Sequence, residues 1–473
     1  MSQTITIDPV TRLEGHGKIT IYLDDKGQVE NAQFHVTQVR GFERFAEGRP
    51  FYEMPSLMAR ICGICPVSHL IASAKACEAI MSVRIPHTAA QLRRMLNLAQ
   101  MVQSHALSFF YLSSPDLLLG MESDPKTRHL FGVVAAKPEL GRAGVSLRRF
   151  GQHIIELLGD KRIHPGWVIP GGVTEPLLAA KRDEILKMIP QAYADVKLAL
   201  GWYKQIADSF KPEADVFANF PSLFLGLVNE DESVEFTDGA LRLIDAEGAI
   251  VEDGITATRF AEAIGEAVEP YSYTKFAYYK PLGYPQGSYR VGPLARLNIA
   301  KTMGTPLADK ELVEFKQLAK GPVQSSFYYH HARLVDILYG IEKIEEILTD
   351  PKILDTHVRA QAAVNRLEGA GQAEAPRGTL HHHYKVDDDG KIVWANLVIA
   401  TGQNNNAMNK GILQAARHYV KNGKFTEGTL NRVEAVVRTF DPCLSCSTHA
   451  FGQMPLALTI LNHDGEVVDQ LIR

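Results

Sequence analysis

Two Cys-x-x-Cys pairs lie near opposite ends of this chain, Cys62 with Cys65 and Cys443 with Cys446. They contain four of its five cysteines. Each pair presents two thiols within one turn of chain, a spacing that can grip one soft metal ion. Two such pairs supply a four-sulfur site only if the fold brings the two ends of the chain together. This requirement is the strongest constraint that the sequence places on the fold.

The composition is that of an ordinary globular protein, with 473 residues that are 45% hydrophobic and 22% charged. A chain of this length can bury a large core. The formal charge of −4 provides no basic field, so we expect no nucleic-acid binding. We also expect no membrane span, because no apolar run approaches the roughly 20 residues that a bilayer requires. The absence of a signal-peptide pattern and the odd cysteine count favour a cytoplasmic chain with reduced thiols.

Hydrophobic periodicity predicts an α+β fold that is mainly helical. Apolar residues alternate over residues 4–37, which predicts strands, and recur at helical spacing from Gln91 until Pro115 should stop the helix. Further helices are expected over 140–158, 176–209, 307–319, 326–349, 405–420 and 428–439, and strands over 221–256, 379–386 and 392–400. There is no repeat or long linker. We therefore expect one compact unit with a long central helix bundle, an N-terminal sheet, small peripheral β-sheets and a hairpin-like tail.

The paired cysteines alone leave the metal open. Structural zinc commonly occupies such pairs, but with about 15–20 residues between them. The wide separation here excludes a local knuckle, although neither zinc nor an iron–sulfur cluster is excluded. Each pair has a histidine downstream, His69 and His449, and an Asp441-Pro dipeptide precedes the second pair. Such neighbours are expected where outer groups tune a metal for chemistry.

Together these motifs resemble those of the large subunit of nickel–iron hydrogenases. The resemblance is carried by Arg-x-Cys-Gly-x-Cys-x-x-x-His at 60–69 and by Asp-Pro-Cys-x-x-Cys-x-x-His at 441–449. Four further blocks keep the family's order: Arg12-Leu-Glu-Gly-His16, Arg40-Gly-Phe-Glu43, His164-Pro to Gly-Gly-Val173, and Glu374-Ala-Pro-Arg-Gly378. The resemblance extends from residue 8 to the C-terminus and implies the large-subunit fold of that family.

Three longer stretches resemble the bidirectional, NAD-linked cytoplasmic members, at residues 8–17, 291–298 and 400–406. The function implied is that of the catalytic subunit of an NAD-reducing hydrogenase, which reversibly splits H2 into protons and electrons. Two partners are implied: an iron–sulfur small subunit, and a diaphorase module that carries FMN and further clusters and meets NAD. No Gly-x-Gly-x-x-Gly segment follows a strand, so we do not expect NAD to bind this chain itself.

The resemblance assigns the four clustered cysteines to a Ni–Fe(CN)2(CO) centre. Cys62 and Cys443 are implied as terminal nickel ligands, and Cys65 and Cys446 as thiolates that bridge nickel to iron. Soft thiolates suit both metals. Cys77 lies outside the motifs, and we expect it in the core.

The resemblance also implies a base and a guanidinium beside the centre. Cys443 would receive the proton from H2 and Glu14 would relay it outward, although a glutamate is more usually a charged loop residue. Arg377 would lie over the open metal face, donate to cyanide and polarise H2, as suits its fixed fork of donors. Pro376 would hold Arg377 in place.

Three more polar residues are implied around this centre. Asp116 and Asp441 would be the carboxylate partners of Arg377, with a bland surface ion pair as the alternative. Thr401 would be a second donor to cyanide.

A magnesium site is implied by Glu43 and His449, together with a backbone carbonyl near Leu397. Magnesium prefers oxygen, so a histidine ligand would be unusual. The run His381-His-His383 could also chelate nickel, but a strand with satisfied histidines is the commoner setting.

Large subunits of this family are made as precursors and cut after the last motif. The bond implied here is His449–Ala450, which gives a mature domain of residues 1–449 and a propeptide of residues 450–473, removed by a maturation endopeptidase. A tail that keeps Cys443 and Cys446 away would let nickel enter before the site closes. An ordinary edge hairpin is the alternative.

Three other interpretations remain. The same site could serve a deazaflavin or heterodisulfide-linked acceptor. The chain could be a noncatalytic scaffold like the homologous quinone-module subunit of respiratory complex I, although those homologues lack the full cysteine set. It could also be a structural protein stapled by zinc.

Overall fold

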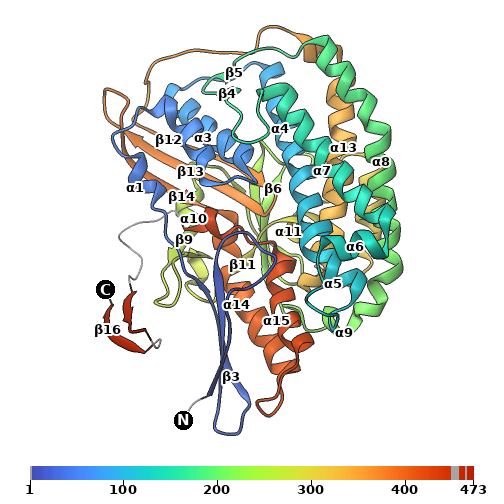
Figure 1. The fold of residues 1–473 in the computed structure, drawn as a ribbon. Helices are drawn as coiled ribbons and strands as arrows, with labels where there is room; N and C mark the ends of the chain where they lie inside the picture. The colour runs from blue at the N-terminus through green and yellow to red at the C-terminus, as the bar shows by residue number, and fades with distance from the viewer. Residues whose placement is uncertain (1–2, 449–456, 464–465, 473) are drawn as a thin grey trace.

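Four long helices form a bundle that fills one side of the molecule (Figure 1). They are α4 (His87–Ala106), α7 (Pro138–Gly159), α8 (Ala179–Ala207) and α13 (Tyr329–Thr349). In the computed structural model, which describes residues 3–448, 457–463 and 466–472, α4 packs between α7 and α13. The predicted apolar positions of α4 are buried, and so are its polar residues Arg93, Asn97 and Gln100. Because α4 is covered on nearly every side, it is the central helix of the core.

The helix that was predicted to stop at Pro115 continues past it. After α4 the chain makes a π-helical turn over Leu107–Ser113 and enters α5 (Ser114–Leu119). Pro115 lies in the first turn of α5, where its missing N–H leaves no intrahelical hydrogen bond unmade. The predicted stop is therefore wrong, and the helical path ends at Gly120 instead.

The remaining helices surround the bundle and the sheets. They are α1 (Phe42–Ala46), α2 (Met54–Met58), α3 (Pro66–Met81), α6 (Leu130–Ala136), α9 (Lys211–Ala214), α10 (Phe260–Ala263), α11 (Pro293–Ile299), α12 (Pro306–Lys316), α14 (Ala400–Tyr419), α15 (Glu427–Phe440) and α16 (Leu444–Ser447). Across the described residues, every helix is too short or too polar to cross a bilayer.

Small sheets lie around the helices. The N-terminal sheet has the order β1 (Gln3–Ile7), β2 (Gly17–Leu23), β3 (Val29–Val36), and a second three-stranded sheet has the order β12 (Glu368–Ala375), β13 (Gly378–Val386), β14 (Ile392–Val398). The four-stranded sheet has the order β11 (Tyr289–Arg290), β6 (Leu223–Val228), β7 (Ala240–Ile244), β8 (Ile250–Ile255). Two short pairs are β4 (Val168–Ile169) with β5 (Gly172–Val173), and β9 (Ile264–Ala267) with β10 (Phe276–Tyr279). The predicted α+β fold, mainly helical with small sheets, is confirmed.

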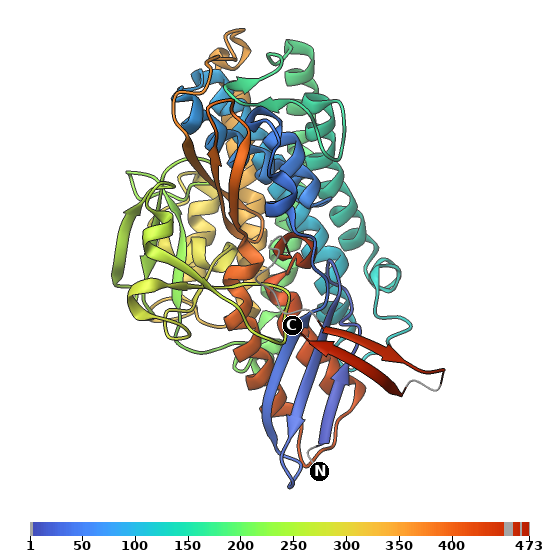
Figure 2. The same ribbon diagram turned by 90° about the vertical axis from the view of Figure 1, so that its left-hand side faces the viewer.

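The N-terminal sheet projects below the helices in Figure 2, and β3 packs against α14. Its strands alternate as predicted, because Ile19 and Ile21 of β2 are fully buried. The loop between β1 and β2 reaches up from this sheet toward the second cysteine pair.

Helix α3 lies flat on the β12–β13 hairpin. A Cβ atom at Gly371 of β12 would come 2.2 Å from the carbonyl oxygen of Ala72 in α3, so only glycine permits this close approach. The contact places the N-terminus of α3, with the first cysteine pair, beside the turn of the hairpin that carries Pro376 and Arg377.

The predicted hairpin-like tail is present as β15 (Ala457–Leu461) paired antiparallel with β16 (Val467–Ile472). Figures 1 and 2 both show this hairpin outside the body of the molecule. The side chains of Ile460, Val467 and Val468 on it are each more than half exposed.

Candidate metal centre

The two cysteine pairs meet in one buried cluster, as their spacing required. The four sulfur atoms all lie within 4.8 Å of one another, and each cysteine is at most 4% exposed. Cys62 Sγ is 3.4 Å from Cys443 Sγ, and Cys65 Sγ is 3.6 Å from Cys446 Sγ. In the described part of the chain, these cysteines are the one group of three or more side chains placed to hold a metal ion. The donor set of four thiolates fits a soft transition metal.

Local backbone geometry presents the first pair to this cluster. Cys65 is the N-cap of α3, and Pro66 occupies the first helical position, which it favours. The backbone N–H groups of Ile64 and Cys65 each lie 3.2 Å from Cys62 Sγ and donate to it. These peptide hydrogen bonds favour a thiolate at Cys62.

The thiols of the two pairs differ in acidity. Hydrogen bonds with Cys443 and Cys446 lower the pKa of Cys62 well below its usual value and lower the pKa of Cys65 to about 6. Burial raises the pKa of Cys443 and of Cys446. Burial therefore disfavours the charged form of the second pair.

Glu14 lies directly on the second cysteine pair. Its Oε2 is 3.0 Å from Cys443 Sγ and accepts a hydrogen bond from Ser445 N, also at 3.0 Å. Its carbonyl oxygen accepts from Leu444 N at 3.1 Å. Gly15 permits this contact, because a Cβ there would lie 2.7 Å from Leu444 Cβ and the glycine has φ +89°. The structure thus brings the predicted base to the predicted thiol.

Arg377 reaches the cluster from the turn between β12 and β13, where Pro376 precedes it. Its Nε donates to the Asp441 carbonyl at 2.5 Å, and its Nη2 lies 3.0 Å from Asp441 Oδ1. Nη1 also donates to Ser104 Oγ of α4 at 3.3 Å, a contact that sequence reasoning missed. Burial alone would lower the pKa of Arg377, but Asp441 and the cysteines outweigh it and raise that pKa. A fixed cation therefore faces the thiols.

Asp116 does not pair with Arg377. Its carboxylate instead lies 2.5 Å from Arg12, 3.1 Å from Arg438 and 3.6 Å from Arg128. Asp441 is the one carboxylate within ion-pair distance of Arg377 among the described residues. The expectation that both carboxylates would partner Arg377 is therefore wrong for Asp116, because three other arginines already surround it.

Thr401 lies at the start of α14, and its Oγ1 accepts a hydrogen bond from Cys443 N at 2.9 Å. Because the oxygen acts as an acceptor here, its hydroxyl proton can be donated to another group near Cys443.

The structure describes two of the three expected magnesium ligands, Glu43 and Leu397. Glu43 Oε1 accepts from Leu397 N at 2.8 Å and lies 3.7 Å from Lys275 Nζ, whereas His449 lies outside the described residues. Burial raises the pKa of Glu43. A cavity of about 580 Å³ borders Glu43, Lys275 and Glu266. Its carboxylates supply the oxygen donors that magnesium prefers.

The run of three histidines does not form a chelating cluster. His381 stacks on Phe260, with 4.2 Å between ring centroids, and His383 Nε2 pairs with Glu368 at 2.7 Å. His382 is buried and lies 3.2 Å from Nδ1 of His69, the histidine of the first motif. Each histidine thus has its own partner, from α10, α3 or β12, the alternative that sequence analysis favoured.

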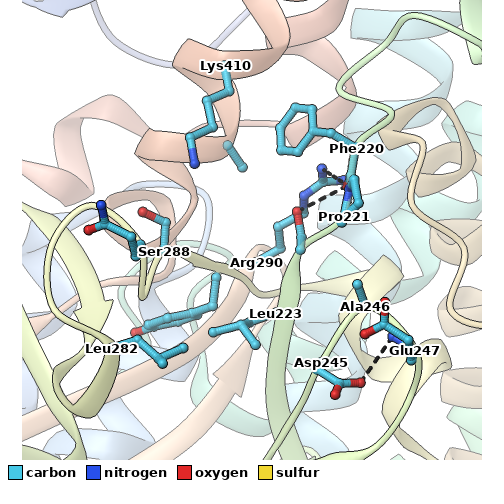
Figure 3. A pocket seen from close by; sticks show the side chains of 14 residues that line it. Phe220, Pro221, Leu223, Asp245, Ala246, Glu247, Leu282, Ser288, Arg290 and Lys410 are labelled. Carbon is cyan, nitrogen blue, oxygen red and sulfur yellow. Dashed lines mark hydrogen bonds between the residues drawn. The ribbon is translucent and has the colours of Figure 1, made fainter.

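A separate pocket opens at the surface between α14, β6 and β11 (Figure 3). Its volume is about 310 Å³, and Lys410 points into it opposite Asp245 and Glu247. Arg290 lines it, and its Nη1 and Nη2 donate to backbone carbonyls, including that of Ala218 at 2.7 Å from Nη2. The pocket shares no residue with the cysteine cluster. It presents both signs of charge, so it does not indicate one class of ligand.

Comparison with known proteins gives consistent matches over the whole chain. The family model described as nickel-dependent hydrogenase matches residues 40–126 and 228–449, and one described as HoxL-like matches residues 4–39. The beta subunit of the NAD-reducing hydrogenase HoxS of Cupriavidus necator is 40% identical over all of both chains. The matching subunit of the F420-non-reducing hydrogenase vhc of Methanococcus voltae is 42% identical over 96% of this chain and 97% of that one.

Solved structures share the fold. A crystal structure of an NAD+-reducing [NiFe]-hydrogenase in the H2-reduced state has a TM-score of 0.92 and 42% identity, covering 94% of this chain and 99% of that one. The Ni-Fe-Se hydrogenase of D. vulgaris Hildenborough has a TM-score of 0.76 at 24% identity, covering 95% of this chain and 100% of that one. Because the identity is low, this similarity shows the fold alone.

Proposed function

This chain belongs to the nickel-dependent hydrogenase family, as its motifs predicted, and on that premise we propose that it is the catalytic subunit of an NAD-reducing [NiFe] hydrogenase. It would split H2 reversibly into protons and electrons. The Cupriavidus necator relative, whose name states that activity, aligns with it from end to end.

The observation that carries this proposal is the contact between Glu14 and Cys443 inside a four-thiol cluster. A structural zinc site needs only four ligands, and four thiolates are one such set. Here a carboxylate lies 3.0 Å from one of the sulfurs, and the Arg377 guanidinium is buried beside them. An acid–base group on a metal-binding thiol suits a reaction that moves protons.

The four cysteines would hold the nickel and iron, with Cys62 and Cys443 on nickel and Cys65 and Cys446 between the two metals. When bound, the nickel–iron centre with its carbonyl and cyanides supplies the place where H2 is split.

The protein's own groups would then handle the proton. Cys443 Sγ takes it and passes it to Glu14 Oε2 across 3.0 Å. The hydrogen bond from Ser445 N holds that oxygen in place during transfer. From Glu14 the proton leaves by way of the partly exposed N-terminal loop.

Arg377 would supply a fixed positive charge over the centre. Asp441 orients its guanidinium through two hydrogen bonds, and Ser104 receives a third. Such preorganised donors stabilise developing negative charge without moving. Thr401 would add a hydroxyl donor toward a cyanide.

Electrons would leave through a partner subunit. The fifth cysteine, Cys77, is buried and donates to the carbonyl of Phe51, so it is not placed to hold a cluster with the other four. We therefore infer that the direct electron acceptor is an iron–sulfur small subunit, followed by a diaphorase module with FMN that reduces NAD. A complex of this kind would be cytoplasmic.

A second candidate keeps the site and changes the acceptor. The Methanococcus voltae relative is as similar as the NAD-reducing one, and its name excludes F420 rather than naming NAD. A heterodisulfide-linked module would then replace the diaphorase. The complete cysteine cluster argues against a noncatalytic, complex I-like role.

Two further expectations are also part of the proposal: a magnesium site and the removal of the C-terminal tail. Glu43, the Leu397 carbonyl and His449 would hold magnesium, and an endopeptidase would cut after His449 to remove residues 450–473. Thr448 is already fixed, because its carbonyl accepts from Arg40 N at 2.7 Å. The four sulfurs are clustered while the β15–β16 hairpin is present.

Metal analysis and infrared spectroscopy of the purified complex test the proposal. We expect one nickel per catalytic chain, with iron in excess of nickel because the partner subunits carry iron–sulfur clusters, together with infrared bands from iron-bound carbonyl and cyanide. One zinc per chain without those bands would reject it. NAD reduction by H2 in the same preparation separates the NAD-linked candidate from the heterodisulfide-linked one.

A further inference from the structure

The Asp116 carboxylate joins three segments of the chain. Its Oδ1 accepts from Arg12 Nη2 at 2.5 Å and from Asn431 Nδ2 at 3.0 Å, and its Oδ2 lies 3.1 Å from Arg438 Nε. Arg12 belongs to the N-terminal loop, Asp116 to α5, and Asn431 and Arg438 to α15. One buried carboxylate therefore ties this loop to two helices that are distant in sequence.

The loop conformation at Arg12 depends on these contacts. Arg12 has φ 56°, in the left-handed region that residues other than glycine rarely adopt. Such a conformation persists only where surrounding contacts over-determine it. Besides Asp116, Arg12 donates through Nη1 to the carbonyl of Leu112 at 2.7 Å, within the π-helical turn before α5. The Arg12 side chain thus holds the loop in a shape that the backbone does not favour on its own.

The neighbouring residue Thr11 is fixed to α15 as well. Its N–H and its hydroxyl donate to the Glu434 carboxylate at 2.8 and 3.1 Å, and its carbonyl accepts from Arg438 at 3.2 Å. Because Thr11 and Arg12 are both anchored, Glu14 lies only two residues from a fixed part of the backbone. Helix α15 runs directly into Asp441 and the second cysteine pair, so both ends of the Glu14–Cys443 contact are mounted on the same helix.

Asp116 offsets the positive charge of three arginines that surround it. The side chains of Arg12, Arg128 and Arg438 are 15%, 5% and 1% exposed, and Asp116 is the carboxylate that all three approach. Glu434 faces Arg438, and the more exposed Glu427 faces Arg128. Burial alone would raise the pKa of Asp116, but Arg438 and Arg12 outweigh it and lower that pKa. A neutral side chain at this position would leave buried arginines in mutual repulsion, which costs stability.

We propose that Asp116 is a positioning residue for proton transfer: through Arg12 and α15 it fixes the N-terminal loop so that the Glu14 carboxylate stays on Cys443. This inference rests on the proposed function. It differs from the role that the sequence resemblance implied, in which Asp116 would act through Arg377. The two roles predict different consequences when Asp116 is changed.

The test uses the complete enzyme complex with Asp116→Asn, which removes the charge and keeps the size, and with Arg12→Lys, which removes the fork that contacts Asp116, Asn431 and Leu112. Two measurements are made on each. The rate of hydrogen isotope exchange between H2 and D2O reports proton transfer through Glu14. The infrared bands of the cyanides report the contact with Arg377. Nickel and iron content is measured in parallel.

The matched control is Glu78→Gln. Glu78 is also a buried carboxylate, paired with Arg93 at 2.6 Å, but it lies on α3 away from the N-terminal loop. It measures the general cost of neutralising a buried ion pair.

We expect isotope exchange to fall by about 10- to 100-fold in Asp116→Asn and Arg12→Lys, the scale of a misplacement of about 1 Å, with metal content and cyanide bands unchanged. Glu78→Gln should exchange at the wild-type rate per metal centre. Shifted cyanide bands in Asp116→Asn, or wild-type exchange in both variants, would overturn the inference. If Asp116→Asn does not accumulate, Arg12→Lys decides alone. Failure of the proposed function looks different, since the wild-type complex would then lack the infrared bands and the exchange altogether.

Discussion

Glu14 and Cys443 are 429 positions apart in the sequence, yet the carboxylate of one lies 3.0 Å from the sulfur of the other. Backbone pairing between the same two segments, from Leu444 N to the Glu14 carbonyl, holds them at this distance. The contact therefore belongs to the fold itself and does not depend on side-chain rotation alone. Substitutions at this contact and in its surroundings should have distinct, measurable effects.

Glu14→Gln should reduce H2 turnover by at least about 100-fold, because the amide keeps the shape but cannot accept and release the proton. Nickel and iron content should remain at the wild-type level. Turnover is measured by H2-dependent dye reduction, with the exposed Glu139→Gln on α7 as the control. Wild-type turnover in Glu14→Gln would remove this residue from the proton path.

Arg377→Lys should also reduce turnover by about 100-fold, although the charge is conserved. Lysine cannot reproduce the two hydrogen bonds to Asp441 and the one to Ser104. The cyanide infrared bands should shift as well, since a donor near them has been lost. Unshifted bands at full activity would mean that Arg377 does not face the centre.

Acid should destabilise the protein partly through His381. Burial lowers the pKa of His381 to about 4 from its usual 6.5, so folding favours the neutral ring. This contribution is present above about pH 6.5 and is lost as the pH falls toward about 4, up to about 3 kcal/mol. His381→Gln should therefore reduce the loss of stability between about pH 7 and pH 4, measured by urea unfolding. The exposed His87→Gln should lose as much stability over this pH range as the wild type does. An equally large loss in His381→Gln would contradict the lowered pKa of His381.

Gly371→Ala should destabilise the protein by about 3 kcal/mol, because the new methyl group would press on the Ala72 carbonyl of α3. Gly166→Ala is the control, since a Cβ at that position has no neighbour within 4 Å. Its effect should stay within about 0.5 kcal/mol. Equal melting temperatures for the two variants would show that α3 can move away from the hairpin.

Mass spectrometry of the active complex should show a chain that ends at His449. The cut removes residues 450–473, including the hairpin that protrudes from the body. Replacing Ala450 by proline should block the cut, because proline after the scissile bond restricts the backbone there. Full activity from a chain that still ends at Arg473 would assign the hairpin a different role.

Sequence periodicity predicted the elements whose packing is local. The alternation in β2 and the helical spacing in α4 are each set by one buried face, so pattern alone finds them. Strand β12 was missed because its sequence, EGAGQAEA, has almost none of the residues that favour strands. Its conformation comes from α3, which lies so close that only glycine and other small residues fit. Such tertiary causes are invisible in a single segment.

The cysteine convergence was predictable because a metal needs ligands from both pairs. The surroundings of Asp116 were not, because Arg12, Arg128 and Arg438 come from three distant parts of the chain and carry no common spacing. The family resemblance implied that Asp116 pairs with Arg377, but a resemblance does not show which of several arginines a carboxylate contacts. Only the geometry distinguishes the two partners.

The late position of Cys443 and Cys446 also has a consequence for biosynthesis. Proteins emerge from the ribosome with their N-terminal parts first, and those parts begin to fold before the rest is made. The helical bundle and the first cysteine pair can therefore be in place while the last residues are still being translated. A prematurely terminated chain would resemble the finished protein in most of its structure but would lack Cys443 and Cys446. Only a chain synthesised through these two cysteines can therefore form the complete centre.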